Sequence, residues 1–241
     1  MGVDLSLVCK GFEDPVQDAQ RCFRTILSAL SQPGTVGCLD TIAPHQPPGP
    51  WSEAAWAVAM TLLDGDTRVW LSPSLATAAA HASLQFHTSC NMTKNPAEAD
   101  FAFVGHPGEQ PDWASLRQGE PEFPDLSATI ILQVPGITVV EPSESSGGES
   151  PPTKVAPNVG PNVGPNVAPN ASPSSTLQLQ GPGIEHTRRI RLERGAEGRW
   201  AEQLRLALVA NRSQFPLGVD LLMVWSDRLC AIPRSTRVAA I

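Results

Sequence analysis

Two arginines and a histidine in this sequence have the chemistry to hold an anionic ligand: Arg24, Arg234 and His87. Arginine is suited to bidentate contact with phosphate. The imidazole of His87, within Leu84-Gln-Phe-His-Thr88, is a candidate general base or phosphate ligand. Each also has a structural interpretation, because exposed arginines are usually just solvated and a partly buried imidazole usually hydrogen-bonds to its neighbours.

Asp64 adds a carboxylate to this set, with Asp66 two residues later and Arg237 three residues beyond Arg234. The aspartate pair has the chemistry to bind a metal carried by a nucleotide, whereas its ordinary role in an Asp-Gly-Asp turn is to cap its own backbone. If these side chains bind a ligand rather than serve structural roles, Arg24, Asp64, His87 and Arg234 share one anion-binding cleft.

The better-known catalytic motifs are missing. The sequence has no Walker A loop, no GxGxxG, no GxSxG and no HExxH. Gly181-Pro-Gly183 is able to present backbone N–H groups to an anion, but it is also what a tight structural turn requires. The lysines are Lys10, Lys94 and Lys154, so a Schiff-base enzyme would have to use Lys94, and nothing around Lys94 favours that.

The five cysteines, at positions 9, 22, 38, 90 and 230, form no CxxC pair and have no clustered histidine partner. Zinc sites need ligands two to five residues apart, so no metal site is expected. We expect buried, reduced thiols, which fits a cytoplasmic protein. The sequence shows no apolar run of about 18 residues, so no transmembrane helix is expected, and no signal peptide is expected either.

The formal net charge of −7 is unevenly distributed. It is −9 over residues 1–140, −2 over 141–175 and +4 over 176–241. An acidic total argues against a general nucleic-acid binder, while the basic last part leaves a local anion site open.

The elements that must position these residues follow from capping and periodicity. A helix begins at Asp14-Pro15 and ends at Pro33-Gly34, with Gln17 completing a capping box and an apolar stripe through Val16, Ala19, Phe23, Ile26 or Leu27, and Leu30. Further helices are expected from Ser52 to about Leu63, from Ser72-Pro73 through Leu75 and Ala79, and from Trp200 to about Ala210. Strands are expected at 68–71, 101–104, 128–134, 176–180, 186–192, 219–225 and 228–232. This order predicts an α/β protein with a mixed sheet and helices packed on it.

Residues 141–175 hold eight of the 24 prolines and a four-residue repeat, Pro157-Asn-Val-Gly, Pro161-Asn-Val-Gly, Pro165-Asn-Val-Ala. Proline at every fourth position blocks helix and strand alike. Since the flanking strands look internal to a domain, we predict a disordered loop insertion rather than an interdomain linker. Residues 1–241 are then a single domain.

The ordered set of stretches resembles the PhnH family, the H subunit of the bacterial carbon–phosphorus lyase system. The resemblance rests on Asp14 to Arg24, Ser31-Gln-Pro-Gly34, Asp64 to Leu71, Leu84 to Thr88, Ala128 to Val134, Gly181 to Ile184, Phe215 to Asp220 and Ala231 to Thr236. It spans nearly the whole chain from residue 14 to 238, and the 141–175 insertion is the departure from the family pattern.

The resemblance implies a three-layer fold similar to the large domain of pyridoxal-phosphate-dependent transferases, without the cofactor lysine. It also implies homodimers in isolation and a core complex with the G, I and J subunits. With the L subunit, that complex replaces the adenine of ATP with a phosphonate, giving a ribose 1-phosphonate 5-triphosphate. The chain itself has no cysteine cluster for an iron–sulfur centre, so it is not the subunit that cleaves the carbon–phosphorus bond.

Three hypotheses follow. The first is an accessory subunit of the complex, cytoplasmic, used when phosphate is scarce and binding no cofactor of its own. The second is direct contact with the ribose triphosphate or phosphonate through Arg24, His87, Arg234 and Asp64. The third, a free-standing pyridoxal-phosphate enzyme, predicts a yellow protein and is not expected.

Overall fold

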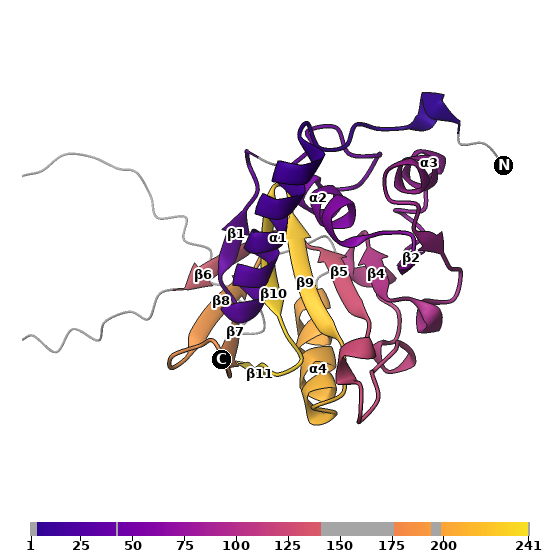
Figure 1. Ribbon diagram of the computed structural model, residues 1–241. Coiled ribbons are helices and arrows are strands. Elements are labelled where there is room, and N and C mark those ends of the chain that lie inside the picture. Colours follow the sequence, from indigo (N-terminus) through magenta and orange to yellow (C-terminus); the bar gives the residue numbers. More distant parts are fainter. Residues whose placement is uncertain (1–3, 42, 141–175, 194–198, 241) are drawn as a thin grey trace, which may run out of the picture.

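A computed structural model of the chain describes residues 4–41, 43–140, 176–193 and 199–240. Its main element is a seven-stranded mixed sheet in the order β1-β10-β9-β5-β4-β2-β3 (Figure 1). The strands are β1 (Val36–Cys38), β2 (Arg68–Leu71), β3 (Asn91–Met92), β4 (Phe101–Val104), β5 (Thr129–Gln133), β9 (Asp220–Trp225) and β10 (Arg228–Ile232). The five from β9 to β3 are parallel, and β10 and β1 continue the sheet antiparallel.

A second, antiparallel sheet has the order β11-β7-β8-β6. Its strands are β6 (Ile137–Val140), β7 (Thr176–Gln180), β8 (Arg188–Leu192) and β11 (Arg237–Ala240). Both β6 and β7 pair with β8, so the strands on either side of residues 141–175 belong to the same sheet. The predicted insertion 141–175 lies outside the described residues.

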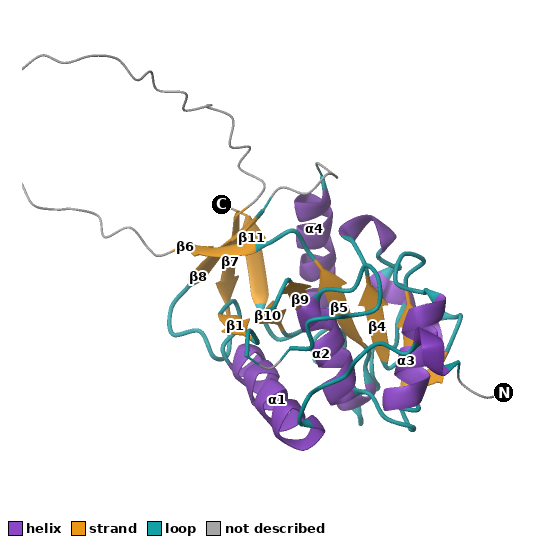
Figure 2. Ribbon diagram, turned by 90° about the horizontal axis from the view of Figure 1, so that it is seen from above, coloured by secondary structure: helices purple, strands orange, loops and turns teal. Residues whose placement is uncertain are grey.

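Helices cover the large sheet in layers. On one face lie α1 (Pro15–Ser31), α2 (Glu53–Leu62) and α3 (Ala78–His87), and on the other lie α4 (Trp200–Ser213) and the small sheet (Figure 2). Two apolar cores match these layers: one joins α1, α2 and α3 to the sheet, and the other joins α4 and the small sheet to it. Short 3₁₀ turns are η1 (Leu5–Leu7), η2 (Pro96–Glu98), η3 (Pro107–Glu109), η4 (Trp113–Ser115) and η5 (Pro124–Leu126).

The predicted α/β class with a mixed sheet is confirmed, and the reason is visible in β5. Ile130, Ile131 and Leu132 are fully buried because the strand has neighbours on both sides and apolar cores on both faces. Among the helices of the described residues, none combines the length and hydrophobicity that a transmembrane span requires.

The predicted stripe of α1 is wrong in part. Cys22, Ile26 and Ala29 face the core, while Val16, Phe23 and Leu27 are exposed by 75%, 45% and 48%. Through this face the helix packs against β10 and β1. The helix start is as expected at Asp14. The side chain that closes the capping box differs: Asp14 N–H donates to the carboxylate of the inward-facing Asp18 (3.0 Å) and not to the side-chain amide of Gln17.

A second expectation is corrected next to β2. Ser72-Pro73 does not begin a helix, since Ser72 Oγ accepts a hydrogen bond from Gly105 N–H (2.9 Å) and so ties β2 to β4. The helix begins at Ala78 instead, capped by Thr77.

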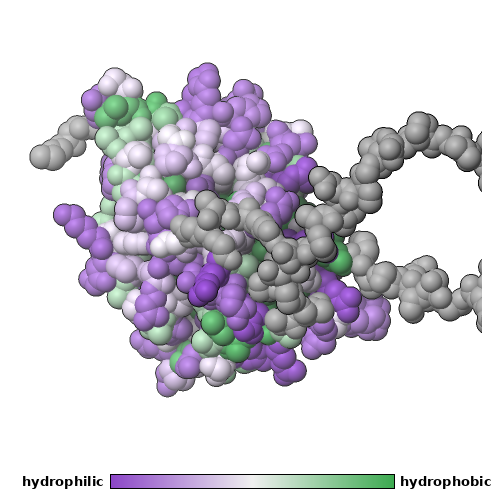
Figure 3. All heavy atoms as spheres, turned by 180° about the vertical axis from the view of Figure 1, so that it is seen from behind, coloured by the Kyte–Doolittle hydropathy of each residue, from purple (hydrophilic) through white to green (hydrophobic). Residues whose placement is uncertain are grey.

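The cysteine expectation is also only partly right: all five are free, but only Cys22, Cys90 and Cys230 are buried. The face seen in Figure 3 is mostly hydrophilic, with small apolar patches.

Candidate functional site

The region that most resembles a ligand-binding site is a crevice at the carboxyl ends of three parallel strands. Since β4, β5 and β9 are parallel neighbours, Val104, Gln133 and Trp225 end at one edge of the sheet. In open α/β sheets ligands bind in the crevice outside the carboxyl ends of the strands. A pocket of about 500 Å³ lies here, lined by Ser52, Gly105, His106, Pro107, Gln133, Val134, Pro135, Trp200, Val224, Trp225 and Ser226.

Gln133 holds this crevice together. Its Oε1 accepts a hydrogen bond from the backbone N–H of Ser52. Its Nε2 donates to the carbonyl oxygens of Pro50 (3.0 Å) and Gly105 (3.1 Å). One side chain at the end of β5 therefore joins the segment before α2 to the segment after β4.

The start of α2 forms one wall of the crevice. Ser52 is its N-cap, and Ser52 Oγ accepts from Ala55 N–H (3.1 Å). The amide just before it, Ala54 N–H, donates to Ser226 O (2.7 Å) in the β9–β10 turn. Ser226 is a non-glycine residue with a φ of 44°, which this two-residue hairpin turn requires. The helix start and the hairpin thus fix each other.

His106 supplies the titratable group in the lining. It follows β4 by two residues, and its Nε2 lies 3.4 Å from Glu109 Oε1. Glu109 is anchored in turn by Ser74, whose N–H (3.1 Å) and Oγ (2.6 Å) donate to its carboxylate. An imidazole oriented by a carboxylate is an arrangement that recurs in general acid–base sites.

The carboxylate of this pair favours its charged form. Desolvation is the largest single influence on the pKa of Glu109 and acts to raise it. Hydrogen bonds from Ser72 and Ser74, together with nearby His106, outweigh desolvation and leave the pKa below its ordinary value. Glu109 is therefore a carboxylate anion placed beside the His106 imidazole.

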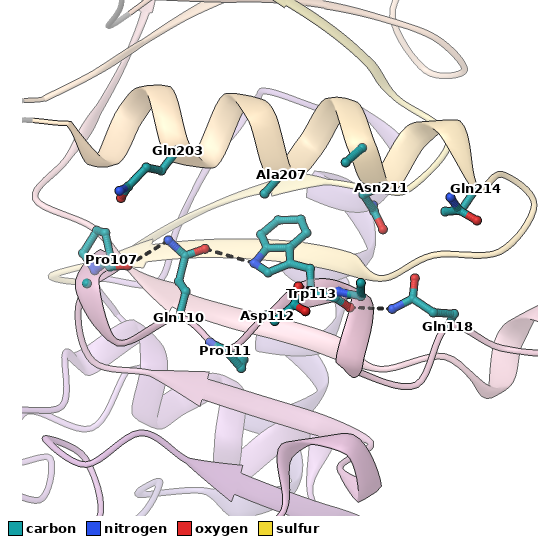
Figure 4. Close-up of a pocket in the computed structure, with 13 residues that line it drawn as sticks. Pro107, Gln110, Pro111, Asp112, Trp113, Gln118, Gln203, Ala207, Asn211 and Gln214 are labelled. Atoms are coloured by element: carbon teal, nitrogen blue, oxygen red, sulfur yellow. Dashed lines mark hydrogen bonds between the residues drawn. The ribbon is translucent and has the colours of Figure 1, made fainter.

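A larger groove adjoins the crevice and shares Pro107 with it. It has a volume of about 630 Å³ and runs between α4 and the 107–114 segment (Figure 4). In Figure 4, Gln203, Ala207, Asn211 and Gln214 line it from the helix, and Trp113 rises from the opposite wall. The remaining lining residues are Gly108, Gln110, Pro111, Asp112, Ala114, Gln118 and Ala210.

Amide side chains fix the walls of this groove. Gln110 Oε1 accepts from the indole N–H of Trp113 (3.1 Å), and Gln118 Nε2 donates to Trp113 O (2.6 Å). Asn211, which is buried, bonds both backbone groups of Val219, accepting from its N–H (2.8 Å) and donating to its O (2.9 Å). The walls are preformed but contain little charge.

The electrostatics of both pockets are unsuited to a polyphosphate. Neither lining contains lysine or arginine, and His106 is the only group able to carry positive charge in either. A third pocket of about 450 Å³ mixes Lys10, Arg21 and His45 with three carboxylates, those of Glu13, Asp14 and Asp18. None of the three resembles the arginine- and lysine-rich sites that hold phosphate groups.

The four predicted site residues lie apart from these pockets, and none of them lines one. Arg24 is exposed on α1, away from the sheet. Asp64 Oδ1 accepts from the N–H groups of Asp66 (3.0 Å) and Thr67 (3.1 Å) in the turn before β2.

The other two predicted residues also bond to their neighbours. His87 Nε2 is 2.8 Å from Cys9 O at the end of α3. Arg234 is paired with Asp220, its Nη2 2.5 Å from Oδ2, and also donates to Pro124 O. The structure does not bring the four into one cleft, and their contact with substrate stays a prediction. Within the described residues, no group of three or more His, Cys, Asp or Glu side chains is arranged to hold a metal ion.

Comparison with known proteins identifies the family. Residues 10–239 match the family described as "Bacterial phosphonate metabolism protein (PhnH)". The chain belongs to the PhnH family. A curated relative, the α-D-ribose 1-methylphosphonate 5-triphosphate synthase subunit PhnH of Rhizobium meliloti (strain 1021), is 32% identical over 227 residues, covering 94% of this chain and 93% of the relative.

In this PhnH chain, sequence reasoning missed the residues that form the crevice. His106 follows the expected strand 101–104, and Gln133 lies near the end of the expected strand 128–134. A position at the carboxyl end of a strand was the signal that could have identified them. Using it requires knowing that the two strands are parallel neighbours, which the chain order alone does not specify.

Proposed function

We propose that this chain is an accessory subunit of the carbon–phosphorus lyase core complex. It supports the ATP-dependent step in which a phosphonate replaces adenine to give ribose 1-phosphonate 5-triphosphate. It has no independent activity, binds no cofactor itself, and acts in the cytoplasm when phosphate is scarce. The observation that carries the proposal is the near full-length similarity to a synthase subunit.

The composition of the pockets supports an accessory role. A triphosphate carries several negative charges, and its sites usually gather arginine, lysine or a metal ion. The crevice and the groove offer such a ligand only His106 among the described residues. Other subunits would then hold the triphosphate, and this chain would act through protein contacts.

The outer side of α1 supports a role in protein contacts. Val16, Phe23 and Leu27 lie at positions i, i+7 and i+11 and form one exposed apolar stripe on the helix. Exposed apolar patches mark interaction sites. We propose the G, I and J subunits as partners, the L subunit for the coupling step, and a homodimer in isolation.

We also propose that the layered fold resembles the large domain of pyridoxal-phosphate-dependent transferases. The carboxyl-end crevice would correspond to a ligand-binding region in such a fold. Its lining contains no lysine, so a Schiff base at this place is not part of the proposal.

Co-purification tests the proposed function. The chain is co-expressed with the G, I and J subunits, captured through a tag on another subunit and analysed by size exclusion. The wild-type chain is expected to co-elute. Phe23→Asp should weaken the complex, whereas Phe123→Asp should not, because Phe123 is also exposed (56%, against 45% for Phe23) but lies away from α1, at the N-cap of η5. Failure of the wild-type chain to join a stable complex would rule out the proposal.

The alternative is direct contact with the ribose triphosphate or phosphonate through Arg24, His87, Arg234 and Asp64. The test is Arg234→Ala in the assembled complex. The alternative expects lower turnover with assembly intact. Unchanged turnover would dispose of it.

A further inference from the structure

The outer face of the small sheet carries a cluster of arginines. The four strands β6, β7, β8 and β11 contain four arginines and no acidic residue, in a chain with a net charge of −7. Arg188 bonds to the carbonyl oxygens of Gln32 (3.2 Å) and Pro33 (2.8 Å). The guanidinium groups of Arg189, Arg191 and Arg237 make no hydrogen bond or ion pair with another described residue.

The strand register places these three side chains on the same face. Arg189 pairs with Gln178 and Arg191 with Thr176, while Arg237 pairs with Gln180. Directly paired residues in antiparallel strands point to the same side, as do residues two apart. The alternate residues, including Leu177, Leu179, Ile190 and Leu192, are buried in the core behind the sheet.

The spacing of the arginines suits a broad surface better than a small ligand. Arg189 and Arg191 are about 7 Å apart along β8, and Arg237 lies two strands away, about 10 Å across the sheet. None of the three lines any of the pockets described above. Small-molecule sites are concave, whereas these three arginines lie on one face of a sheet, at the end of the molecule away from α3 (Figure 2).

We infer that this face, centred on Arg189, Arg191 and Arg237, docks a protein partner that presents a carboxylate-rich surface. The inference rests on the proposed function, because it requires a partner subunit. Three like charges with no counter-charge bonded to them among the described residues repel one another, and an acidic partner relieves that repulsion. Complementary charge of this kind steers association and fixes its orientation.

The experiment compares two variants with the same change in net charge. Arg189, Arg191 and Arg237 are all replaced by Glu in one variant. In the control, Lys10, Lys94 and Arg199, which are exposed elsewhere on the chain, are replaced by Glu. Binding of the full chain to the proposed partner subunits, purified together without it, is measured by interferometry in 0.1 M and 1 M NaCl.

The arginine variant is expected to bind at least about tenfold more weakly in 0.1 M NaCl and within about twofold of wild type in 1 M, because the screening length falls from about 10 to about 3 Å. The control variant should stay close to wild type at both concentrations. If the charge reversals prevent folding, replacing the same three arginines by Gln gives the same contrast with a smaller loss.

Three results would overturn the inference. Equal weakening by both variants would show that net charge, not this face, controls binding. Micromolar binding of tripolyphosphate that the arginine variant loses would make the face a small-anion site. Loss of self-association in that variant would make the occupant a second copy. If the wild-type chain does not bind the subunits at all, the proposed function itself fails.

Discussion

Gln133 is the residue on which the crevice depends most, and replacing it tests how the site is built. Gln133→Leu keeps the approximate volume but removes three hydrogen bonds, to Ser52 N–H, Pro50 O and Gly105 O. Each backbone group left without a partner costs about 1 kcal/mol where water can reach it, and up to about 3 kcal/mol where it cannot. Because the crevice is open to solvent on one side, we expect a total loss of about 2–4 kcal/mol.

The assay is equilibrium unfolding in guanidinium chloride, followed by fluorescence of the six tryptophans. Gln203→Leu is the matched control, since Gln203 is exposed on α4 and its side chain makes no hydrogen bond with another described residue. The control should change stability by less than about 0.5 kcal/mol. If Gln133→Leu is no more destabilising than Gln203→Leu, the proposed role of Gln133 in the crevice is incorrect.

Three further predictions concern other parts of the fold. Gly183→Ala should lower stability by at least about 2 kcal/mol in thermal unfolding, because φ is +79° and a Cβ would lie 1.8 Å from Ser31 O; a smaller loss would mean that the turn relaxes easily. Because the pKa of Glu109 is lowered in the folded state, its charge stabilises above pH about 4.5 and that contribution is lost as the pH falls further. The melting-temperature difference between wild type and Glu109→Gln should therefore shrink in acid, and a constant difference would contradict this. Iodoacetamide should label exposed Cys38 in the native protein, while Cys230, whose pKa burial raises to about 12, should react only after unfolding; mass spectrometry of peptides distinguishes the two.

Local signals in the sequence were enough to predict most helices and strands. Asp14-Pro15 caps and begins α1, and the continuous apolar run at 128–134 becomes the central strand β5, because both effects depend on residues close in the chain. Short edge strands such as β1, β3 and β11 were not expected. Their two to four residues form strands only because a partner lies beside them.

The orientation of α1 shows where local reasoning stops. Apolar residues cover about half of its circumference, so periodicity alone does not decide which part faces the sheet. The core accepts Cys22, Ile26 and Ala29 and leaves Phe23 and Leu27 outside. This choice depends on the shape of the opposing strands.

The candidate site was less predictable than the fold. Arg24, Asp64, His87 and Arg234 have suitable side chains, but His87 and Arg234 are engaged by partners that only the folded chain supplies, Cys9 O and Asp220. Asp64 caps its own turn, the ordinary role that the sequence also offered. The crevice depends instead on Gln133, and glutamine is not one of the usual general acid–base side chains. Its importance comes from the meeting of three strand ends, which is a property of topology.

Reconstitution of ATP-dependent phosphonate coupling tests the central claim most directly. Product formation is measured for this chain alone, for the other subunits without it, and for the full set. The accessory-subunit account predicts no product from the chain alone, reduced turnover without it, and restoration when it is added back. Turnover by the isolated chain, or full activity of the complex without it, would contradict the account.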